Sequence, residues 1–190
     1  MKELYRVIKY VIDTCDYGLK MHPKKLSEDG LFEIVFFSDS DWAGDKETRQ
    51  SVTGFCIFIQ GCPISWKSKG QKSVTLSSSE AELMALLDAT IELKFIYEVM
   101  TSMGLKVKLP IICRVDNVGA IFIADNATAN PKSKHIDTRA KYVSQYITDG
   151  FLKVMFVKTQ ENCADIFTKN VPGDIMNKHV HDYVINKYDM

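Results

Sequence analysis

Two aspartates stand at the ends of predicted strands, where side chains from separate segments can meet. Asp39 directly follows Ile34–Phe37, a continuously apolar run that is typical of a central strand buried on both faces. Asp116 follows the strand Ile111–Val115 in the same way. The carboxyl ends of neighbouring parallel strands lie at the same edge of a sheet, so the two carboxylates converge if these strands are adjacent. Aspartate also begins many ordinary turns, and for either residue alone that is the interpretation we favour.

A third acid, Glu82, is harder to explain as a structural residue. It lies in the predicted helix 79–103, on the face of the apolar stripe that packs against the sheet. Ser77 and Glu80 can form the capping box of this helix, so that Glu82 is available for another role. In a competing register, Ser79 forms the capping box with Glu82, and Glu82 then serves only as a cap. A carboxylate that faces the core is costly unless a partner or a cation neutralises it. That cost favours a functional role for Glu82.

A fourth acid, Asp165, opens the last predicted short helix, where the helix dipole alone accounts for an acidic residue. Three or four carboxylates at one point would repel one another and raise each other's pKa unless divalent cations lay between them. Mg²⁺ prefers oxygen ligands, and two such ions form the clamp used in phosphodiester hydrolysis. In that chemistry one ion activates the attacking water and the other stabilises the departing 3′ oxygen. No Ser–His or Cys–His pair for nucleophilic catalysis is evident in the sequence.

The elements that must position these acids follow from apolar periodicity and from turn residues. In chain order we predict a helix at 2–14, strands at 34–37, 51–61 and 63–68, a helix at 79–103, a strand at 110–117, helices at 118–126 and 135–148, a strand at 151–157 and a short helix at 163–170. This order predicts an α/β fold: a five-stranded mixed sheet with an antiparallel hairpin half and a parallel half, flanked by helices. We divide the chain into an N-terminal helix and linker (1–30), a central domain (31–172) and a C-terminal tail or helix (173–190).

Composition and charge limit the class of protein. The chain has 190 residues, of which 46% are hydrophobic and 25% charged, which is typical of one globular domain. No apolar run approaches the roughly 20 residues that span a bilayer, and the N-terminus is too charged for a signal peptide, so we expect an intracellular protein. The 24 basic and 24 acidic side chains balance, which argues against a purely electrostatic nucleic-acid binder. The five cysteines form no CxxC pair and do not combine with the histidines at zinc-site spacing, so we expect reduced, mostly buried thiols.

Several motifs in the same order resemble the ribonuclease H superfamily, and within it the copia-type LTR retrotransposon branch. They are SDSDWAGD, SVTGF, PISWKSKGQKSVTLSSSEAELMAL, VDNVGAI, SKHIDTR and ENCADIFTK, and the resemblance covers about residues 32–172. It implies that the catalytic and metal-binding acids are Asp39, Glu82, Asp116 and Asp165, holding two Mg²⁺ ions, with Mn²⁺ as a substitute. The neighbouring acids Asp41 and Glu80 are the alternatives that we reject.

The resemblance implies an endonuclease that cuts the RNA strand of RNA–DNA hybrids during reverse transcription. Such a hybrid is held through its backbone and 2′-hydroxyl groups, with little reading of bases. The residues that we expect to contact it are Ser78, Asn117, Trp66, Lys67, His135 and Arg139. Because the chain is not basic overall, we expect a reverse transcriptase domain of the same polyprotein to supply tight binding. The chain departs from the family pattern at Ser40, where cellular members have glycine, and in the loop 158–162, which lacks their histidine.

Other functions remain open at this stage. Asp39 and Asp41 form a DxD pair of the kind that binds Mn²⁺ in nucleotide-sugar transferases, but nothing else in the sequence supports that class. An EF-hand that begins at Asp39 has Gly44 correctly placed, but it lacks an oxygen ligand at Ala43 and the bidentate glutamate at Gln50. The stronger alternative is a catalytically silent ribonuclease H-like connection, dimerisation or nucleic-acid-binding module.

Overall fold

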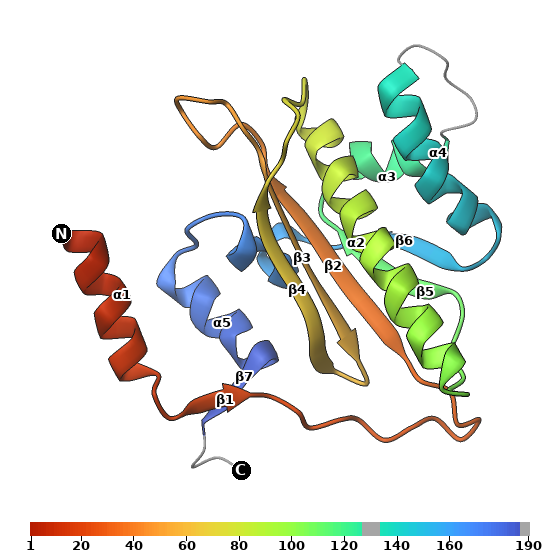
Figure 1. Cartoon of the computed structure of the whole chain (residues 1–190), viewed down its shortest axis with the longest axis horizontal. Coiled ribbons are helices and arrows are strands. Elements are labelled where there is room, and N and C mark those ends of the chain that lie inside the picture. The colour runs from red at the N-terminus through yellow and green to blue at the C-terminus, as the bar shows by residue number, and fades with distance from the viewer. Residues whose placement is uncertain (127–133, 187–190) are drawn as a thin grey trace.

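The computed structural model of the chain describes residues 1–126 and 134–186 (Figure 1). The described elements, in chain order, are α1 (Lys2–Asp13), β1 (Tyr17–Leu19), β2 (Ile34–Asp41), β3 (Val52–Ile59), β4 (Cys62–Gly70), α2 (Ser78–Ser102), β5 (Ile111–Val115), α3 (Val118–Asp125), α4 (Lys134–Thr148), β6 (Leu152–Phe156), the 3₁₀ helices η1 (Thr159–Glu161) and η2 (Cys163–Phe167), α5 (Gly173–Tyr183) and β7 (Val184–Asn186).

The central sheet has the strand order β4-β3-β2-β5-β6. Strand β2 pairs antiparallel with β3 on one side and parallel with β5 on the other, and β5 pairs parallel with β6. The predicted mixed sheet, with one antiparallel and one parallel half, is therefore confirmed. This order makes the two acid-bearing strands β2 and β5 direct neighbours.

One sequence prediction about β2 is wrong in its boundary. The strand does not end at Phe37 but continues to Asp41, which pairs with Val52 of β3. Asp39 therefore lies within the strand, opposite Gly54, rather than after it. Polar residues extend the strand because the ladder of backbone hydrogen bonds to β3 does not depend on apolar side chains.

The face of the sheet that carries α2 holds the larger core. Alternate residues of β2 and β3 point to this face, and they pack with the buried stripe of α2; the fully buried members include Ile34, Phe36, Phe55, Ile57, Leu83, Leu86 and Leu93. Ser77 caps α2 by accepting a hydrogen bond from the Glu80 backbone N–H, and the Glu80 carboxylate accepts one from the backbone N–H of Leu76. The predicted cap therefore forms without Glu82.

The opposite face of the sheet is covered by η2 and α5 (Figure 1). Cys56 and Phe58 of β3 pack there against Cys163 and Tyr183, and the Tyr183 hydroxyl donates a hydrogen bond to the Cys163 carbonyl oxygen at 2.8 Å. After α5, β7 returns to pair antiparallel with β1 as a small two-stranded sheet. Neither strand is predicted from the sequence, because each has only three residues and they pair across most of the chain length.

The predicted N-terminal helix forms, but its apolar stripe is exposed. The stripe consists of Leu4, Val7, Ile8, Val11 and Ile12, each 49–65% exposed. Figure 1 shows α1 standing apart from the central sheet. No described helix is both long and apolar enough to cross a membrane. All five cysteines are free thiols, and every one except Cys15 is buried, as predicted.

Candidate metal centre

Three of the predicted acids meet at one point of the structure. Ligand oxygens from Asp39 of β2, Glu82 of α2 and Asp116 all lie within 4.8 Å of one another. Two neighbouring strands supply the aspartates, because Asp39 lies within β2 and Asp116 directly follows β5. The first turns of α2 bring Glu82 over the same edge. Asp39 and Glu82 are buried, at 1% and 5% exposure, and Asp116 is half-buried.

Neighbouring polar groups hold two of these carboxylates in place. The backbone N–H and the hydroxyl of Ser40 both donate to Glu82 Oε1 at 3.0 Å. The Thr168 hydroxyl donates to Asp39 Oδ2. Each carboxylate thus has one oxygen fixed by the fold, which limits its rotation and orients the other oxygen.

Asp165 adjoins Asp39 on the η2 side of the sheet, the face opposite to α2. It lies in η2, 2% exposed, and Asn162 fixes that turn: its side chain donates to the Ser38 carbonyl oxygen at 3.0 Å and accepts from the Ala164 backbone N–H at 3.2 Å. The Lys169 ammonium bridges the two buried aspartates, 3.2 Å from Asp165 Oδ2 and 3.5 Å from Asp39 Oδ2. Among the described residues, the Lys169 ammonium pairs with two of the four carboxylates, which leaves an excess of negative charge.

The excess charge shifts the acids toward their neutral forms. Burial raises the pKa of Glu82 well above its usual range, and the carboxylates of Asp39 and Asp116 raise it further. Burial and then Asp39 raise the pKa of Asp165 to about 7. Burial also raises the pKa of Asp116, against the opposing effect of a hydrogen bond from Thr159. For Lys169, burial alone would lower the pKa, but the acids outweigh it and raise it.

The donor set fits divalent cations. Glu82 Oε2 and Asp165 Oδ1 are buried oxygens without a hydrogen-bond partner among the described residues. A buried carboxylate oxygen without a partner is costly, and a cation is the group that satisfies several such oxygens together. All the donors are carboxylate oxygens, which is the ligand type that Mg²⁺ and Mn²⁺ accept.

The two rejected acids serve structural roles. Glu80 reaches back to the backbone at the start of α2, as described above. Asp41 is directed toward the turn that follows β2, where its carboxylate lies against Gly44 and leaves no room for a Cβ atom there. Neither is a member of the three-carboxylate cluster of the described residues.

The predicted substrate contacts fall into two groups. Ser78 begins α2, and Asn117 caps α3 by accepting from the Ala120 backbone N–H at 2.9 Å. The Ser79 hydroxyl donates to Asn117 Oδ1 at 3.1 Å, so these two helix starts adjoin each other beside Glu82 and Asp116.

Of the other predicted contacts, Trp66 and Lys67 belong to β4, and Arg139 and His135 belong to α4. Trp66 is 49% exposed and stands opposite Cys56, so it faces the α5 side of the sheet. The Lys67 ammonium is 2.8 Å from Asp88 Oδ2 on α2. Arg139 is half-buried on α4. His135 belongs to the same helix, but its side chain lies outside the described residues.

Four residues of the site were not assigned a role from the sequence: Ser40, Asn162, Thr168 and Lys169. Lys169 carries the one signal that sequence reasoning could have used. It follows Asp165 by four residues, the spacing at which side chains on a helix meet. The others act through hydrogen bonds between segments up to 129 residues apart, for which the sequence gives no sign.

Comparison with known proteins finds retrovirus-related Pol polyproteins of transposons among the relatives of this chain. The chain is 31% identical over 169 residues to the retrovirus-related Pol polyprotein from transposon RE1 of Arabidopsis thaliana, an alignment that covers 89% of this chain and 11% of the relative. It is 37% identical over 136 residues to the corresponding polyprotein from transposon TNT 1-94 of Nicotiana tabacum, covering 72% of this chain and 10% of the relative. The chain thus spans about a tenth of the length of these two polyproteins. No family model matches the sequence.

Solved structures agree on the fold. LC11-RNase H1, isolated from compost by a metagenomic approach, superposes with a TM-score of 0.53 at 14% identity, covering 78% of this chain and 98% of that one. The same enzyme in complex with an RNA/DNA hybrid gives a TM-score of 0.53 at 13% identity, covering 72% of this chain and 94% of that one. The solved structures therefore support the fold, and the Pol polyprotein relatives indicate the kind of parent protein.

Proposed function

Since the chain belongs with the ribonuclease H domains of copia-type retrotransposon Pol polyproteins, we propose that it cuts the RNA strand of RNA–DNA hybrids during reverse transcription. The observation that carries this proposal is the meeting of Asp39, Glu82 and Asp116 within 4.8 Å, with oxygens left unsatisfied. Such a cluster serves no evident structural purpose, because burying like charges together destabilises a fold.

In the proposed site, Asp39, Glu82, Asp116 and Asp165 hold two Mg²⁺ ions, for which Mn²⁺ can substitute. Bound there, the metal ions supply an activated water and stabilise the charge that develops on the leaving 3′ oxygen. The chain's own residues prepare the site. Ser40 and Thr168 fix one oxygen each of Glu82 and Asp39, so these ligands do not have to be ordered when metal binds.

The substrate contacts nearest to the site are the starts of α2 and α3. Ser78 and Asn117 offer a hydroxyl and an amide beside the acids, which suits contact with phosphate and 2′-hydroxyl groups of an RNA strand. Arg139 and His135 of α4 are the outer contacts in this proposal. Lys67 of β4 would have to leave its ion pair with Asp88, and Trp66, on the α5 side of the sheet, would be reached at the edge strand β4.

We further propose that residues 31–172 form the nuclease unit and that residues 1–30 connect it to a reverse transcriptase domain. The exposed apolar stripe of α1 supports the second part of the proposal. A helix of 12 residues is marginal in water on its own, and an apolar face normally requires a partner. Acting in reverse transcription, the chain would work inside the cell.

The test is cleavage of a labelled RNA–DNA hybrid in Mg²⁺ or Mn²⁺. We expect the native chain to cut only the RNA strand, and Asp39→Asn and Glu82→Gln each to lower the rate by at least about a hundredfold, since even outer-shell partners of a metal contribute 10–100-fold. The neighbouring acids provide matched controls: Asp41→Asn and Glu80→Gln remove the same charge outside the cluster and should retain most of the activity.

Three other outcomes are informative. Equal loss in the cluster variants and in the controls would contradict the four-acid site. Hybrid binding without cutting would indicate a domain that needs its polymerase. If the native chain shows neither cutting nor binding, and its stability does not respond to Mg²⁺, the catalytically silent module is the better description.

A further inference from the structure

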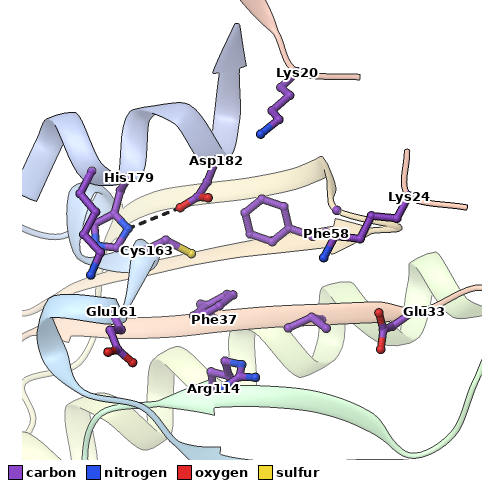
Figure 2. Close-up of a pocket in the computed structure, with 13 residues that line it drawn as sticks. Lys20, Lys24, Glu33, Phe37, Phe58, Arg114, Glu161, Cys163, His179 and Asp182 are labelled. Carbon is purple, nitrogen blue, oxygen red and sulfur yellow. Dashed lines mark ion pairs between the residues drawn. The ribbon is translucent and has the colours of Figure 1, made fainter. Parts of the chain in front are cut away.

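A cavity of about 570 Å³ lies on the α5 side of the sheet, apart from the four acids (Figure 2). Its floor consists of side chains from three adjacent strands, namely Val35 and Phe37 of β2, Phe58 of β3 and Arg114 of β5. Its other walls come from α5, from the turn that contains Cys163 and from the segment after β1. The volume lies within the range of small-molecule sites, which is about 300–1,000 Å³.

The most unusual group in this cavity is the guanidinium of Arg114. Arg114 is half-buried, and it makes no hydrogen bond or ion pair with any residue that the structure describes. Figure 2 shows it rising from β5 beside Phe37, its register partner across the two strands. Withdrawing a cation from water without a partner is unfavourable, and an anion is the partner that a guanidinium binds best.

The half-buried charges of the cavity are cationic, whereas its acids are exposed. Lys20 is half-buried like Arg114 and donates to the His181 carbonyl oxygen at 2.9 Å, and the exposed Lys24 extends into the cavity beside Phe58 (Figure 2). The carboxylates of Glu33 and Glu161 are exposed, so solvent screens them. A third exposed carboxylate, Asp182, already pairs with His179 Nδ1 at 3.5 Å; Lys178, also in the lining, donates to the Gln160 carbonyl oxygen at 2.8 Å.

Next to these cations the floor is aromatic. The rings of Phe37 and Phe58 lie edge to face, with centroids 6.1 Å apart. Such a surface favours a planar apolar group, which packs on one ring face. Charge and shape together therefore favour a ligand that joins an anion to a planar ring.

We propose that this cavity binds a small organic phosphate with a planar ring, the chemistry of a nucleoside monophosphate. Arg114 and Lys24 bind the phosphate, and Phe37 and Phe58 pack against the ring. This site differs from the proposed nuclease centre, since none of the four acids lines it.

The cavity nevertheless adjoins the acids along the chain. Phe37, Arg114 and Cys163 each precede one of the acids by two residues, on β2, β5 and η2 respectively. On a strand this spacing places both side chains on one face. A ligand in the cavity thus contacts the elements that position Asp39 and Asp116, without contacting the carboxylates themselves.

The test is titration of the native chain with AMP in EDTA, followed by calorimetry and by the NMR signals of the phenylalanine rings. We expect saturable binding with shifts of the Phe37 and Phe58 signals, and weaker binding of adenosine and of inorganic phosphate, each of which offers only half of the ligand. Arg114→Gln and Lys24→Gln should each weaken AMP binding at least about tenfold, the factor that corresponds to one lost charge-assisted hydrogen bond.

Two control variants test the location of AMP binding. One shows whether AMP binds in this cavity, and the other shows whether it binds independently of the metal centre. Lys153→Gln removes an exposed lysine of β6 outside the cavity and should bind AMP like the native chain. Asp116→Asn disables the proposed metal centre and should also leave AMP binding unchanged, so failure of the nuclease proposal does not affect this result. Thermal denaturation shows whether Arg114→Gln is folded. Lys24→Gln changes an exposed residue, so it tests the phosphate contact without disturbing the core.

Four results would overturn the proposal. The first two are the absence of AMP binding at millimolar concentration and binding that persists in both cation variants. The third is binding that is lost in Asp116→Asn or that requires Mg²⁺, and the fourth is equal affinity for adenosine, which would exclude a phosphate site.

Discussion

Asp165→Asn should make the metal-free protein more stable, although it removes a proposed catalytic residue. Asp165 is 2% exposed, and its Oδ1 has no hydrogen-bond partner among the described residues. Burial and the neighbouring Asp39 raise its pKa from 3.8 to about 7. Asparagine has nearly the shape of the protonated acid and cannot ionise, so it removes the unfavourable charge.

The pKa shift of Asp165 gives the size of the expected gain in stability and the pH range in which the gain appears. A carboxyl group whose pKa is higher in the folded state binds its proton more tightly there, so the folded state loses stability as the pH rises from about 4 to about 7. A shift of roughly three units corresponds to about 4 kcal/mol. The attraction of the Lys169 ammonium is already contained in this shift, because it lowers the pKa of Asp165 against burial and Asp39. The gain of about 4 kcal/mol corresponds to a rise in Tm of roughly 8–16 °C.

The assay is thermal denaturation in EDTA between pH 4 and pH 8, repeated with excess Mg²⁺. The native chain should lose stability with rising pH in EDTA and recover it when Mg²⁺ binds, whereas Asp165→Asn should show a flatter pH profile and a smaller response to Mg²⁺. Asp125→Asn, which removes an exposed acid at the end of α3, should behave like the native chain. A lower Tm for Asp165→Asn than for the native chain at pH 7 in EDTA would refute the argument that these acids repel one another.

Three further substitutions test other parts of the site. Lys169→Gln removes the ammonium shared by Asp39 and Asp165, so it should lower Tm in EDTA and enlarge the gain in Tm on adding Mg²⁺; an unchanged Mg²⁺ response would contradict this role. Gly54→Ala places a Cβ atom 2.5 Å from Thr168 Cγ2 and 3.1 Å from the Ala164 carbonyl oxygen. Urea denaturation should therefore show a loss of about 1–3 kcal/mol in the free energy of unfolding. Hybrid cleavage should also fall, because η2 carries Asp165. Asn162→Ala leaves the buried Ser38 carbonyl oxygen without its donor, at a cost of about 1–3 kcal/mol in the same measurement, and a loss below about 0.5 kcal/mol would show that η2 is held by other contacts.

The sequence predicted the central sheet and its helices because their signals are local. The apolar run at β2, the turn at Gly61 and the cap at Ser77 each involve neighbouring residues, and each appears in the structure. The boundary of β2 was wrong because its last residues are polar, and only their pairing with β3 extends the strand.

The C-terminal region could not be derived in this way. Helix α5 and strand β7 depend on contacts with distant segments, such as Tyr183 with Cys56 and Leu19 with Val184. Three-residue strands carry too little periodicity to be recognised from sequence, and their pairing depends on the tertiary structure. The cavity beneath α5 follows from the same contacts, and the sequence offers no sign of it.

For the site, the sequence by itself determined which acids to consider, because Glu82 faces the core at a cost and Asp39 and Asp116 end or border apolar strands. It also separated Glu82 from Glu80 through the cap of α2. Only the tertiary structure decided that these acids meet, since that depends on β2 and β5 being neighbours and on α2 crossing their edge. Only the tertiary structure identified the roles of Ser40, Thr168 and Lys169. The strength of an ion pair or a hydrogen bond depends on distance in space, and residues 129 positions apart along the chain have no local signal of their contact.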